Sequence, residues 1–286
     1  MLCRSKMANN HTSMIFTLLL SILIINIMSY FTVFKLEKQF EAYESVDIYN
    51  PNSLKDLRLQ YAMNAEKYAR ALFWASRRDD GAAFYKTVKL EAYCSGRERI
   101  GDIDDGGKYV CMPKNVRKEN CTLLSLGLNN QITYDLHITN ITGGHCTILG
   151  ADKDPQSPKT QELYSNINGK LFVGMIPNEI TINSMMQKAG RKDVDIMKID
   201  IEEGEIKGLE PFIKEYSVCQ ILIELHGPPK VHLEMLQKMA KYNFRIFNVD
   251  PNPYCPGCCE YSMINENCMN QYGVVPLAVT VPISEY

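Results

Sequence analysis

The stretch that most constrains the fold of this chain is DVDIMKIDIEEGE, residues 193–205. Its first part is a short apolar run with few polar interruptions, as in a strand buried on both faces of a parallel sheet. Carboxylates cluster where that strand should end, which is typical of a functional site at the carboxyl edge of an open α/β sheet. The acidic first turn of a helix gives the same pattern, so both interpretations stay open. The carboxylates are Asp200, Glu202, Glu203 and Glu205.

Strand and helix patterns alternate over most of the chain from residue 122 onward. This alternation predicts a mainly parallel, doubly wound sheet. The expected strands are residues 109–112, 122–126, 146–149, 171–173, 194–201, 219–225, 244–249 and 274–281. The expected helices are residues 132–139, 182–189 with Gly190 as the stop, a helix after residue 205 broken by Gly208 and Pro211, and residues 231–242.

Residues 14–34 form an uncharged, mostly apolar run that is long enough to cross a bilayer as a helix. Arg4 and Lys6 precede it and favour a cytoplasmic N-terminus, although Lys35 and Lys38 after it weaken that signal. A cleaved signal peptide is the alternative, but its apolar core would be shorter and would end at small residues. We therefore predict a transmembrane signal anchor and a single-pass type II membrane protein.

The predicted organisation follows from that anchor: a cytoplasmic tail at residues 1–13, the anchor at 14–34, a helical stem at 35–95 and one folded domain at 96–286. A second helix is expected to end near Cys94. The domain would lie in the Golgi or endoplasmic reticulum lumen or at the cell surface. The net charge of −2 gives no electrostatic footprint for nucleic acid, so no nucleic-acid partner is expected.

Two Asn-x-Thr glycosylation acceptor sites, at Asn120 and Asn140, agree with a lumenal domain and predict a glycoprotein. Asn10 also fits the pattern but would lie on the cytoplasmic side. In an oxidising compartment the cysteines after the anchor are expected to form disulfides.

Four cysteines gather near the C-terminus, where they form either a zinc knuckle or disulfides; the expected compartment favours disulfides. Cys94 and Cys111 flank the DDGG segment and are a candidate pair. The odd number of cysteines after the anchor leaves at least one thiol unpaired. Cys146 and Cys219, inside apolar runs, are the expected buried free thiols. The clustered cysteines are Cys255, Cys258, Cys259 and Cys268.

The segment RIGDIDDGGKYVC carries a strong turn signal at Asp105, Gly106 and Gly107. Such glycines admit close backbone approach to a ligand, but they also simply make turns. Asp102 and Asp104 form an Asp-x-Asp pattern like the one that holds a metal–nucleotide sugar in many membrane-anchored glycosyltransferases. That pattern should follow a strand, and here an Arg- and Glu-rich stretch precedes it. A type II glycosyltransferase remains an alternative function.

Two of these segments resemble a known family. DIMKIDIEEGE, followed by a strand that ends in IELH, resembles the FkbM-type methyltransferase signature, roughly D-(I/L)-(I/L)-K-I-D-(I/V)-E-G-(A/G)-E. RIGDIDDGGKYVC resembles the lead-in of the animal membrane-anchored, methyltransferase-like branch. The resemblance runs from about residue 99 to 282. It implies a class I, Rossmann-like fold that uses S-adenosylmethionine, with a mostly parallel sheet whose last strand is antiparallel.

The resemblance also implies site residues. The strand ending at Gly127 would be the first of the sheet, residues 126–130 its cofactor loop, and Asp152 the acceptor for the ribose hydroxyls. Lys198, Asp200, Glu202 and Glu205 fall on the charged positions of the signature. Two departures, a cofactor loop with one glycine and Glu203 where the signature has glycine, leave a catalytically inactive binding protein as an alternative. The predicted cofactor-binding residues are Gly127, Asn129, Asp152, Asp105 and Gly106.

The predicted reaction is O-methylation, with Asp200, Glu202 and His226 as catalytic candidates. A hydroxyl acceptor needs a group that takes its proton, and Asp200 with Glu224 and His226 would form either that base or a site for magnesium or manganese. A histidine by itself is more often structural. The acceptor is not encoded in any motif; a glycan, a lipid or a small molecule follows only from the expected compartment.

Overall fold

The computed structural model describes residues 51–103, 106–202 and 204–283. The chain divides into two compact units, residues 1–56 and 57–286, and the second contains the folded domain. Helix α2, Pro51–Ser76, lies within the predicted stem of residues 35–95, and the rest of the described stem holds α3, Gly81–Thr87, and β1, Ala92–Tyr93.

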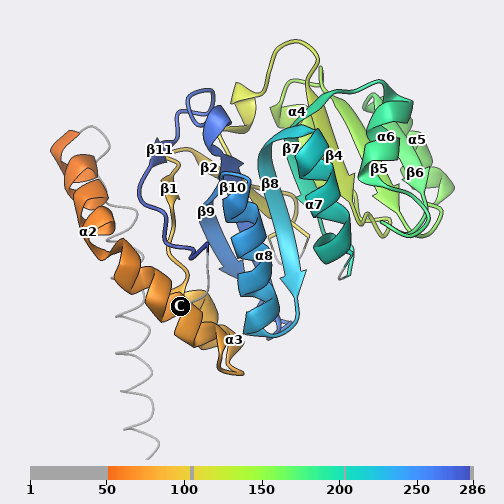
Figure 1. Ribbon diagram of the computed structural model, residues 1–286. Helices are drawn as coiled ribbons and strands as arrows, with labels where there is room; N and C mark the ends of the chain where they lie inside the picture. The colour runs from red at the N-terminus through yellow and green to blue at the C-terminus, as the bar shows by residue number, and fades with distance from the viewer. Residues whose placement is uncertain (1–50, 104–105, 203, 284–286) are drawn as a thin grey trace, which may run out of the picture. The chain divides into compact units, whose positions relative to one another are not determined.

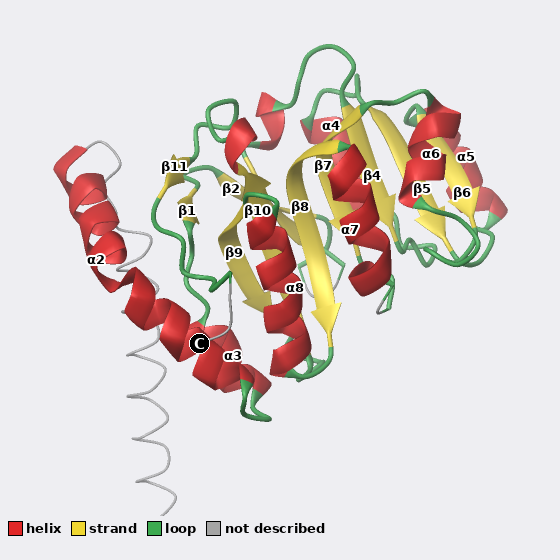
Figure 2. Ribbon diagram, in the orientation of Figure 1, coloured by secondary structure: helices red, strands yellow, loops and turns green. Residues whose placement is uncertain are grey.

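The main sheet has seven strands in the order β6-β5-β4-β7-β8-β10-β9 (Figures 1 and 2). Neighbouring strands are parallel except for β10, which is antiparallel to both β8 and β9. This order confirms the predicted doubly wound, mostly parallel class I fold. The strands are β4 Thr122–Leu126, β5 Thr147–Asp152, β6 Gly169–Val173, β7 Asp193–Ile199, β8 Ser217–His226, β9 Phe244–Pro251 and β10 Cys258–Asn265.

Both faces of this sheet are covered. One buried cluster packs α3, α6, α7 and α8 against one face, where α7 and α8 lie in front of the strands in Figure 2. A second cluster packs α4, α5 and the β2–β3 hairpin against the other face. The bounds are α3 Gly81–Thr87, α4 Thr133–Ile141, α5 Pro158–Asn166, α6 Ile182–Ala189, α7 Glu205–Glu215, α8 Pro229–Lys241, β2 Arg97–Ile100 and β3 Lys108–Cys111, with 3-10 turns η1 Pro113–Asn115 and η2 Glu266–Cys268.

The central strand β7 shows why its sequence is almost continuously apolar. Met197 and Ile199 belong to the cluster under α7 and α8, whereas Ile196 belongs to the cluster on the opposite face. Burying one such side chain contributes about 1.5–3 kcal/mol.

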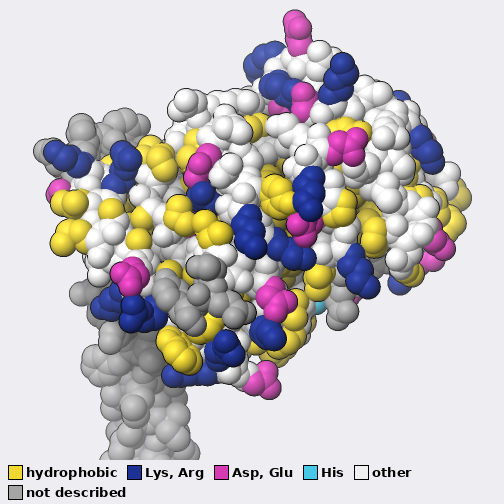
Figure 3. Space-filling view, in the orientation of Figure 1, with side chains coloured by type: hydrophobic (Ala, Val, Ile, Leu, Met, Phe, Trp, Pro, Cys, Tyr) yellow, Lys and Arg dark blue, Asp and Glu magenta, His cyan; other side chains and the backbone are white. Residues whose placement is uncertain are grey.

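On the surface of the molecule that carries α7 and α8, basic and acidic side chains are interspersed (Figure 3).

The β2–β3 hairpin is fastened to the sheet by side chains of β8 and β10. Gln220 accepts a hydrogen bond from the Cys111 amide (2.9 Å) and donates one to the Cys111 carbonyl (2.8 Å). Ser262 donates to the Tyr109 carbonyl at 2.8 Å. Because β3 is held at both points, Lys108 at its start lies over the sheet.

Several element predictions are corrected. The predicted strand 274–281 shrinks to β11, Val275–Pro276, which pairs with β1, Ala92–Tyr93, outside the main sheet. The antiparallel strand is instead β10, in the segment read as a Cys-rich loop. Residues 259–263 alternate between apolar and polar types, but seven of the eight residues of the strand are buried, including Glu260 and Ser262. The helix expected to end near Cys94 is α3, which ends at Thr87 because the residues that follow lead into β1.

Helix α7 was expected to break at Gly208 and Pro211, but it runs through both. A Cβ on Gly208 would lie 3.0 Å from the Ile176 side chain, so glycine allows a close approach there. Leu209 and Phe212, both buried, hold the helix on the sheet despite the proline.

The cysteine predictions are confirmed in part. Cys94 pairs with Cys111 as expected. Cys255 pairs with Cys258, but Cys268 pairs with Cys219, so the expectation that Cys219 is free is wrong. Cys219 lies on β8 and Cys268 follows the neighbouring β10; adjacency in the sheet, which sequence spacing does not reveal, sets this pairing.

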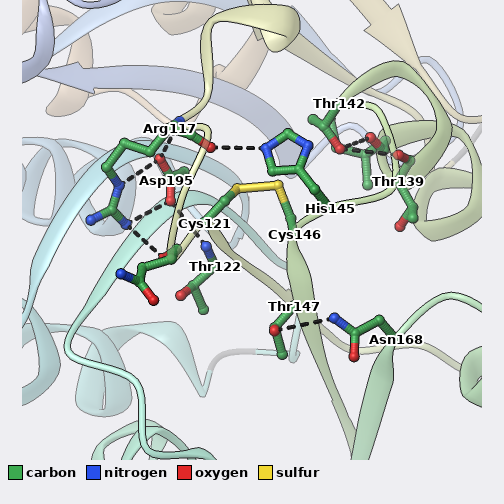
Figure 4. Close-up of a disulfide and its surroundings, with 12 residues drawn as sticks. Arg117, Cys121, Thr122, Thr139, Thr142, His145, Cys146, Thr147, Asn168 and Asp195 are labelled. Carbon is green, nitrogen blue, oxygen red and sulfur yellow. Dashed lines mark hydrogen bonds and ion pairs between the residues drawn. A yellow bond between two sulfur atoms is a disulfide. The ribbon is translucent and has the colours of Figure 1, made fainter.

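The expectation that Cys146 is free is wrong for the same reason. Cys121 and Cys146 each immediately precede one of the neighbouring strands β4 and β5, and their Cα atoms are 4.6 Å apart (Figure 4). Within the described residues the free thiol is Cys259, which is buried.

Beside this disulfide, the first acidic residue of the family signature has a structural role (Figure 4). Asp195 is fully buried at the start of β7 and accepts hydrogen bonds from Nε and Nη2 of Arg117 at 2.9 and 2.7 Å. It also accepts the amide of Thr122 at 3.0 Å. Because these partners lie on other segments, Asp195 ties β7 to β4.

The predicted localisation must be corrected. Through residues 51–103, 106–202 and 204–283, no helix combines the length and apolar character that a membrane span requires, so a single-pass type II membrane protein is not supported. The longest of these helices, α2, carries charged residues along its length. The predicted anchor at 14–34 and Asn10 lie outside the described residues.

Candidate functional site

A hollow of about 650 Å³ opens at the carboxyl edge of β4, β5, β6 and β7. It lies where open α/β sheets place their ligands. Its walls are the loops that follow those strands, together with part of the β2–β3 turn. The walls include most of the predicted site residues: Gly106, Gly127, Asn129, Asp152, Asp200 and Glu202.

The loop after β4, residues 126–130, contains a single glycine, and its backbone conformation shows why one is enough. Gly127 has φ +83°, and a Cβ on it would lie 1.7 Å from the Asp200 carbonyl oxygen, so only glycine fits. Asn129 and Asn130 also have left-handed backbones, with φ of 45° and 59°. Asparagine tolerates this conformation better than most residues. The two asparagines therefore take positions where a glycine-rich loop would have glycine.

Asp152 ends β5 and faces the hollow. One carboxylate oxygen accepts the Asn129 amide at 2.7 Å, and the other accepts the Asp154 amide at 3.0 Å. Each oxygen keeps a further lone pair for a ligand hydroxyl. Asp152 thus organises the loop after β4 and remains able to accept hydrogen bonds from a ribose.

Lys198 of β7 forms a hydrogen bond with the loop after β4. Its buried Nζ donates to the Gly127 carbonyl at 3.1 Å. Burial lowers the pKa of Lys198, while the negative charge of Asp200 opposes that shift. The lysine of the signature therefore positions the loop after β4.

Next to the hollow, Lys108 lies among three carboxylates from three strands. Its Nζ is 2.7 Å from Glu260 on β10, 3.1 Å from Glu224 on β8 and 3.7 Å from Asp200, which directly follows β7. Burial disfavours the ammonium form, but these carboxylates outweigh it and raise the pKa of Lys108. The cluster therefore holds a permanent positive charge at its centre.

The three carboxyl groups differ in their proton affinity. Burial raises the pKa of Asp200, and the neighbouring Glu224 adds to the shift while Lys108 opposes it. The pKa of Glu224 is lowered: burial acts upward, but the charge of Lys108 and a hydrogen bond from Asn252 outweigh it. Burial raises the pKa of Glu260 to about 7. Protons in this cluster therefore reside on Asp200 or Glu260 before Glu224.

His226 ends β8 close to the acidic turn. Its Nε2 is 4.0 Å from Glu202 Oε2, and its Nδ1 is buried without a hydrogen-bond partner among the described residues. Glu202 has a left-handed backbone, φ 54°, and its side chain is 84% exposed. A ring nitrogen of His226 also lies within 4.8 Å of a carboxylate oxygen of Asp200. The structure thus brings His226 near Asp200, whereas the Glu202 side chain lies mostly in solvent at the edge of the hollow.

Glu205 is a structural member of the signature. Its Oε1 accepts the Ile201 amide at 2.6 Å at the start of α7, and burial raises its pKa. Glu205 thus caps the acidic turn at the start of α7, whereas Asp200 lines the hollow.

Several groupings bear on a divalent cation. Single ligand atoms of Asp200, Glu205 and His226 lie within 4.8 Å of one another. However, the Lys108 ammonium group already lies beside the Asp200 carboxylate, and Glu205 accepts a hydrogen bond from the Ile201 amide. Both carboxylates therefore have partners other than a metal ion. Two further groupings depend on Cys121 with Cys146 and on Cys258, whose sulfurs are in disulfides and offer no thiolate.

Three predicted positions, Asp104, Asp105 and Glu203, lie outside the described residues. Asp102 of the Asp-x-Asp pattern lines the hollow from the turn after β2, not from a strand of the main sheet. Reasoning from sequence missed Lys108 and Glu260. Lys108 lies in the DGGKYVC segment of the family resemblance, and this position was the signal that could have identified it. Glu260 lies in the Cys-rich segment, where the cysteines were the only residues considered.

The sequence model of the methyltransferase FkbM domain matches residues 79–246, more than half of the chain. This match confirms the predicted resemblance at the level of the family and does not distinguish a branch within it. Among curated proteins no match is found.

Solved structures with a similar fold include methyltransferase-related proteins. The fibrillarin pre-rRNA processing protein of Methanococcus jannaschii is 13% identical, covers 56% of this chain and 71% of its own, and has a TM-score of 0.40. Aeropyrum pernix fibrillarin with natively bound S-adenosyl-L-methionine is 14% identical, with 59% and 83% covered and a TM-score of 0.40. Precorrin-6y C5,15-methyltransferase from Geobacter metallireducens is 9% identical, with 54% and 86% covered and a TM-score of 0.39. The assignment of the class I fold is based on the strand order of the main sheet and on the family match, because these TM-scores are low.

Proposed function

Because the chain belongs to the methyltransferase FkbM domain family, we propose that it is an S-adenosylmethionine-dependent O-methyltransferase acting on a hydroxyl compound. The observation that carries this proposal is the position of Asp200. Its carboxyl group lines the hollow at the carboxyl edge of the sheet and also contacts the buried Lys108 cluster.

The residues of the hollow fit the cofactor. Gly127 lets the loop after β4 pack closely against the Asp200 carbonyl, and Asp152 offers free lone pairs for the ribose hydroxyls. Gly106 and Asn129 complete the wall around them. When bound, S-adenosylmethionine supplies a methyl group on a sulfonium, which becomes a neutral thioether once an acceptor oxygen has taken the methyl.

The chain's own contribution is to hold the acceptor and its proton. An acceptor hydroxyl must lose its proton as the oxygen forms its new bond. Asp200, with a pKa raised chiefly by burial, is a stronger base than an exposed aspartate. Lys108 beside it stabilises the negative charge that develops on the acceptor oxygen. The sulfonium is already electrophilic, so the proposed mechanism has no metal-dependent step.

The experiment is titration calorimetry with S-adenosylhomocysteine on the full chain and on Asp152→Ala. The wild type should bind, and the variant should bind more weakly by about 1.5–3 kcal/mol because a charged acceptor for the ribose is lost. Asp154→Ala is the matched control: it removes an exposed carboxylate two residues away and should bind like the wild type.

A wild-type chain that does not bind S-adenosylhomocysteine would refute the proposed function. Equal affinity in Asp152→Ala and wild type would refute only the role of Asp152. Thermal melting of both variants separates a binding defect from loss of the loop that Asp152 organises.

A further inference from the structure

A second hollow, of about 320 Å³, lies on the other side of the Lys108 cluster. Arg99 and Tyr109 of the β2–β3 hairpin form one wall, and residues 250–254, at the end of β9 and in the loop that follows it, form the other. Glu260 also contributes to its lining. Its volume is at the lower end of the ~300–1,000 Å³ range of small-ligand pockets.

Glu260 contributes a buried polar atom that lacks a partner. Its side chain is only 9% exposed, and Oε1 is held by Lys108 at 2.7 Å. Its other oxygen, Oε2, is buried and has no hydrogen-bond partner among the described residues. Buried polar atoms are nearly always satisfied, so an unpaired one beside a hollow points to a ligand group that completes it.

The lining of this hollow carries one cationic side chain, Arg99, and two acidic ones, Asp250 and Glu260. Arg99 pairs with Asp250 at 2.8 Å, and Glu260 shares Lys108 with Glu224 and Asp200. An anionic ligand would therefore meet acidic side chains, whereas burial raises the pKa of Glu260 to about 7, so that its carboxyl group can bond a neutral hydroxyl near neutral pH. The lining therefore favours an uncharged, hydrogen-bonding ligand.

Two aromatic rings give the hollow flat apolar surfaces. Arg99 lies over the Tyr109 ring, 5.4 Å from its centroid, and fixes its orientation. Tyr254 is 74% exposed, and its amide is held by the Asn252 side chain at 2.9 Å. Asn252 in turn donates to Glu224 at 3.0 Å, which ties this wall to the Lys108 cluster. An aromatic face beside carboxylate and amide groups suits a ring that is apolar on its faces and hydroxylated at its edge.

We propose that this hollow is the acceptor subsite and that it binds a neutral saccharide ring, with one hydroxyl on Glu260 Oε2 and the ring against Tyr254. The inference rests on the proposed function, because it assigns the hydroxyl compound of that reaction. Glu260 and Asp200 both contact Nζ of Lys108, at 2.7 and 3.7 Å. A hydroxyl bound at Glu260 therefore lies close to the hollow that holds the cofactor residues.

The experiment is saturation-transfer NMR on the full chain with the methyl glycosides of glucose, galactose, mannose and fucose. At least one glycoside should bind the wild type, and Tyr254→Ala and Glu260→Gln should each weaken its binding about ten-fold or more. Tyr254→Phe keeps the ring and should restore binding. Trp74→Ala removes another exposed aromatic residue, on α2, and should leave binding unchanged.

Calorimetry with S-adenosylhomocysteine separates the two proposals, since Tyr254→Ala should bind it like the wild type. If S-adenosylhomocysteine binds but no glycoside does, the saccharide inference is overturned and the proposed function stands. Binding of catechol or of a primary amine instead of a glycoside would overturn it as well. Glycoside binding that survives in both Tyr254→Ala and Glu260→Gln would place the sugar elsewhere and would also refute it.

Discussion

Lys108 gives the candidate site its electrostatic character. A cation with three oxygen neighbours from three strands resembles the centre of a divalent-metal site, but here the charge belongs to a buried side chain. Such a lysine keeps its charge only while the carboxylates remain, because an isolated buried ammonium is strongly disfavoured. The same charge lowers the pKa of Glu224, the carboxyl that remains ionised most readily.

Asp200→Asn tests the proposed base. Asparagine keeps the shape but loses the charge, and Lys108 retains Glu224 and Glu260, so melting temperature and S-adenosylhomocysteine affinity should stay near those of the wild type. Transfer of a labelled methyl group to a bound glycoside should fall by about 10²–10⁴. Asp154→Asn, an exposed carboxylate outside the lining of the hollow, is the control and should remain active.

Near-wild-type turnover in Asp200→Asn would show that Asp200 is an acidic residue at the end of β7 without a role in catalysis. An unfolded variant would instead identify it as a structural partner of Lys108. Both results contradict the proposed base.

At the scale of elements, the β2–β3 hairpin joins the two hollows. It carries Lys108 into the carboxylate cluster and Arg99 and Tyr109 into the second hollow. The hairpin is not part of the main sheet, so its position depends on the side chains of β8 and β10 that hold its backbone.

Gln220→Met should loosen this hairpin. The change leaves the buried Cys111 amide and carbonyl without their side-chain partners, which typically costs about 1–3 kcal/mol. Hydrogen exchange should quicken at residues 108–111 and stay unchanged in β4 and β7. Gln237→Met, which removes a hydrogen bond to the Pro282 carbonyl, is the control and should leave residues 108–111 protected. Unaltered exchange at residues 108–111 in Gln220→Met would show that other contacts hold the hairpin.

At the scale of the whole molecule, the disulfides close loops of very different length. Cys219 and Cys268 are separated by 49 residues in sequence, whereas Cys255 and Cys258 are separated by 3. A cross-link restricts the unfolded chain more when its loop is longer. The first of these disulfides should therefore contribute more to the stability of the domain than the second.

Replacing Cys219 and Cys268 together by alanine should lower the free energy of unfolding by roughly 4 kcal/mol, and replacing Cys255 and Cys258 by roughly 2 kcal/mol. Denaturant unfolding measures both. Cys259→Ala, which removes the buried free thiol, reports the cost of losing a buried sulfur alone. Equal losses in the two double variants would contradict the loop-length argument.

The sequence by itself determined the elements whose pattern is local. The apolar run of β7, the amphipathic α6 with Gly190 at its end, and the acidic turn after Asp200 were all readable from neighbouring residues, because burial on two faces and left-handed helix ends restrict residue types locally. The fold implied by the family resemblance added Gly127 and Asp152, which line the hollow as expected.

Only the tertiary structure decided which distant residues meet. Lys108 and Glu260 are 152 positions apart and contact only because β10 inserts beside β8 while the hairpin folds over both. The Cys219–Cys268 pairing depends on the same insertion, because it places the end of β10 beside the start of β8. Contacts between strands are set by the packing of whole faces, and no local sequence pattern encodes that packing.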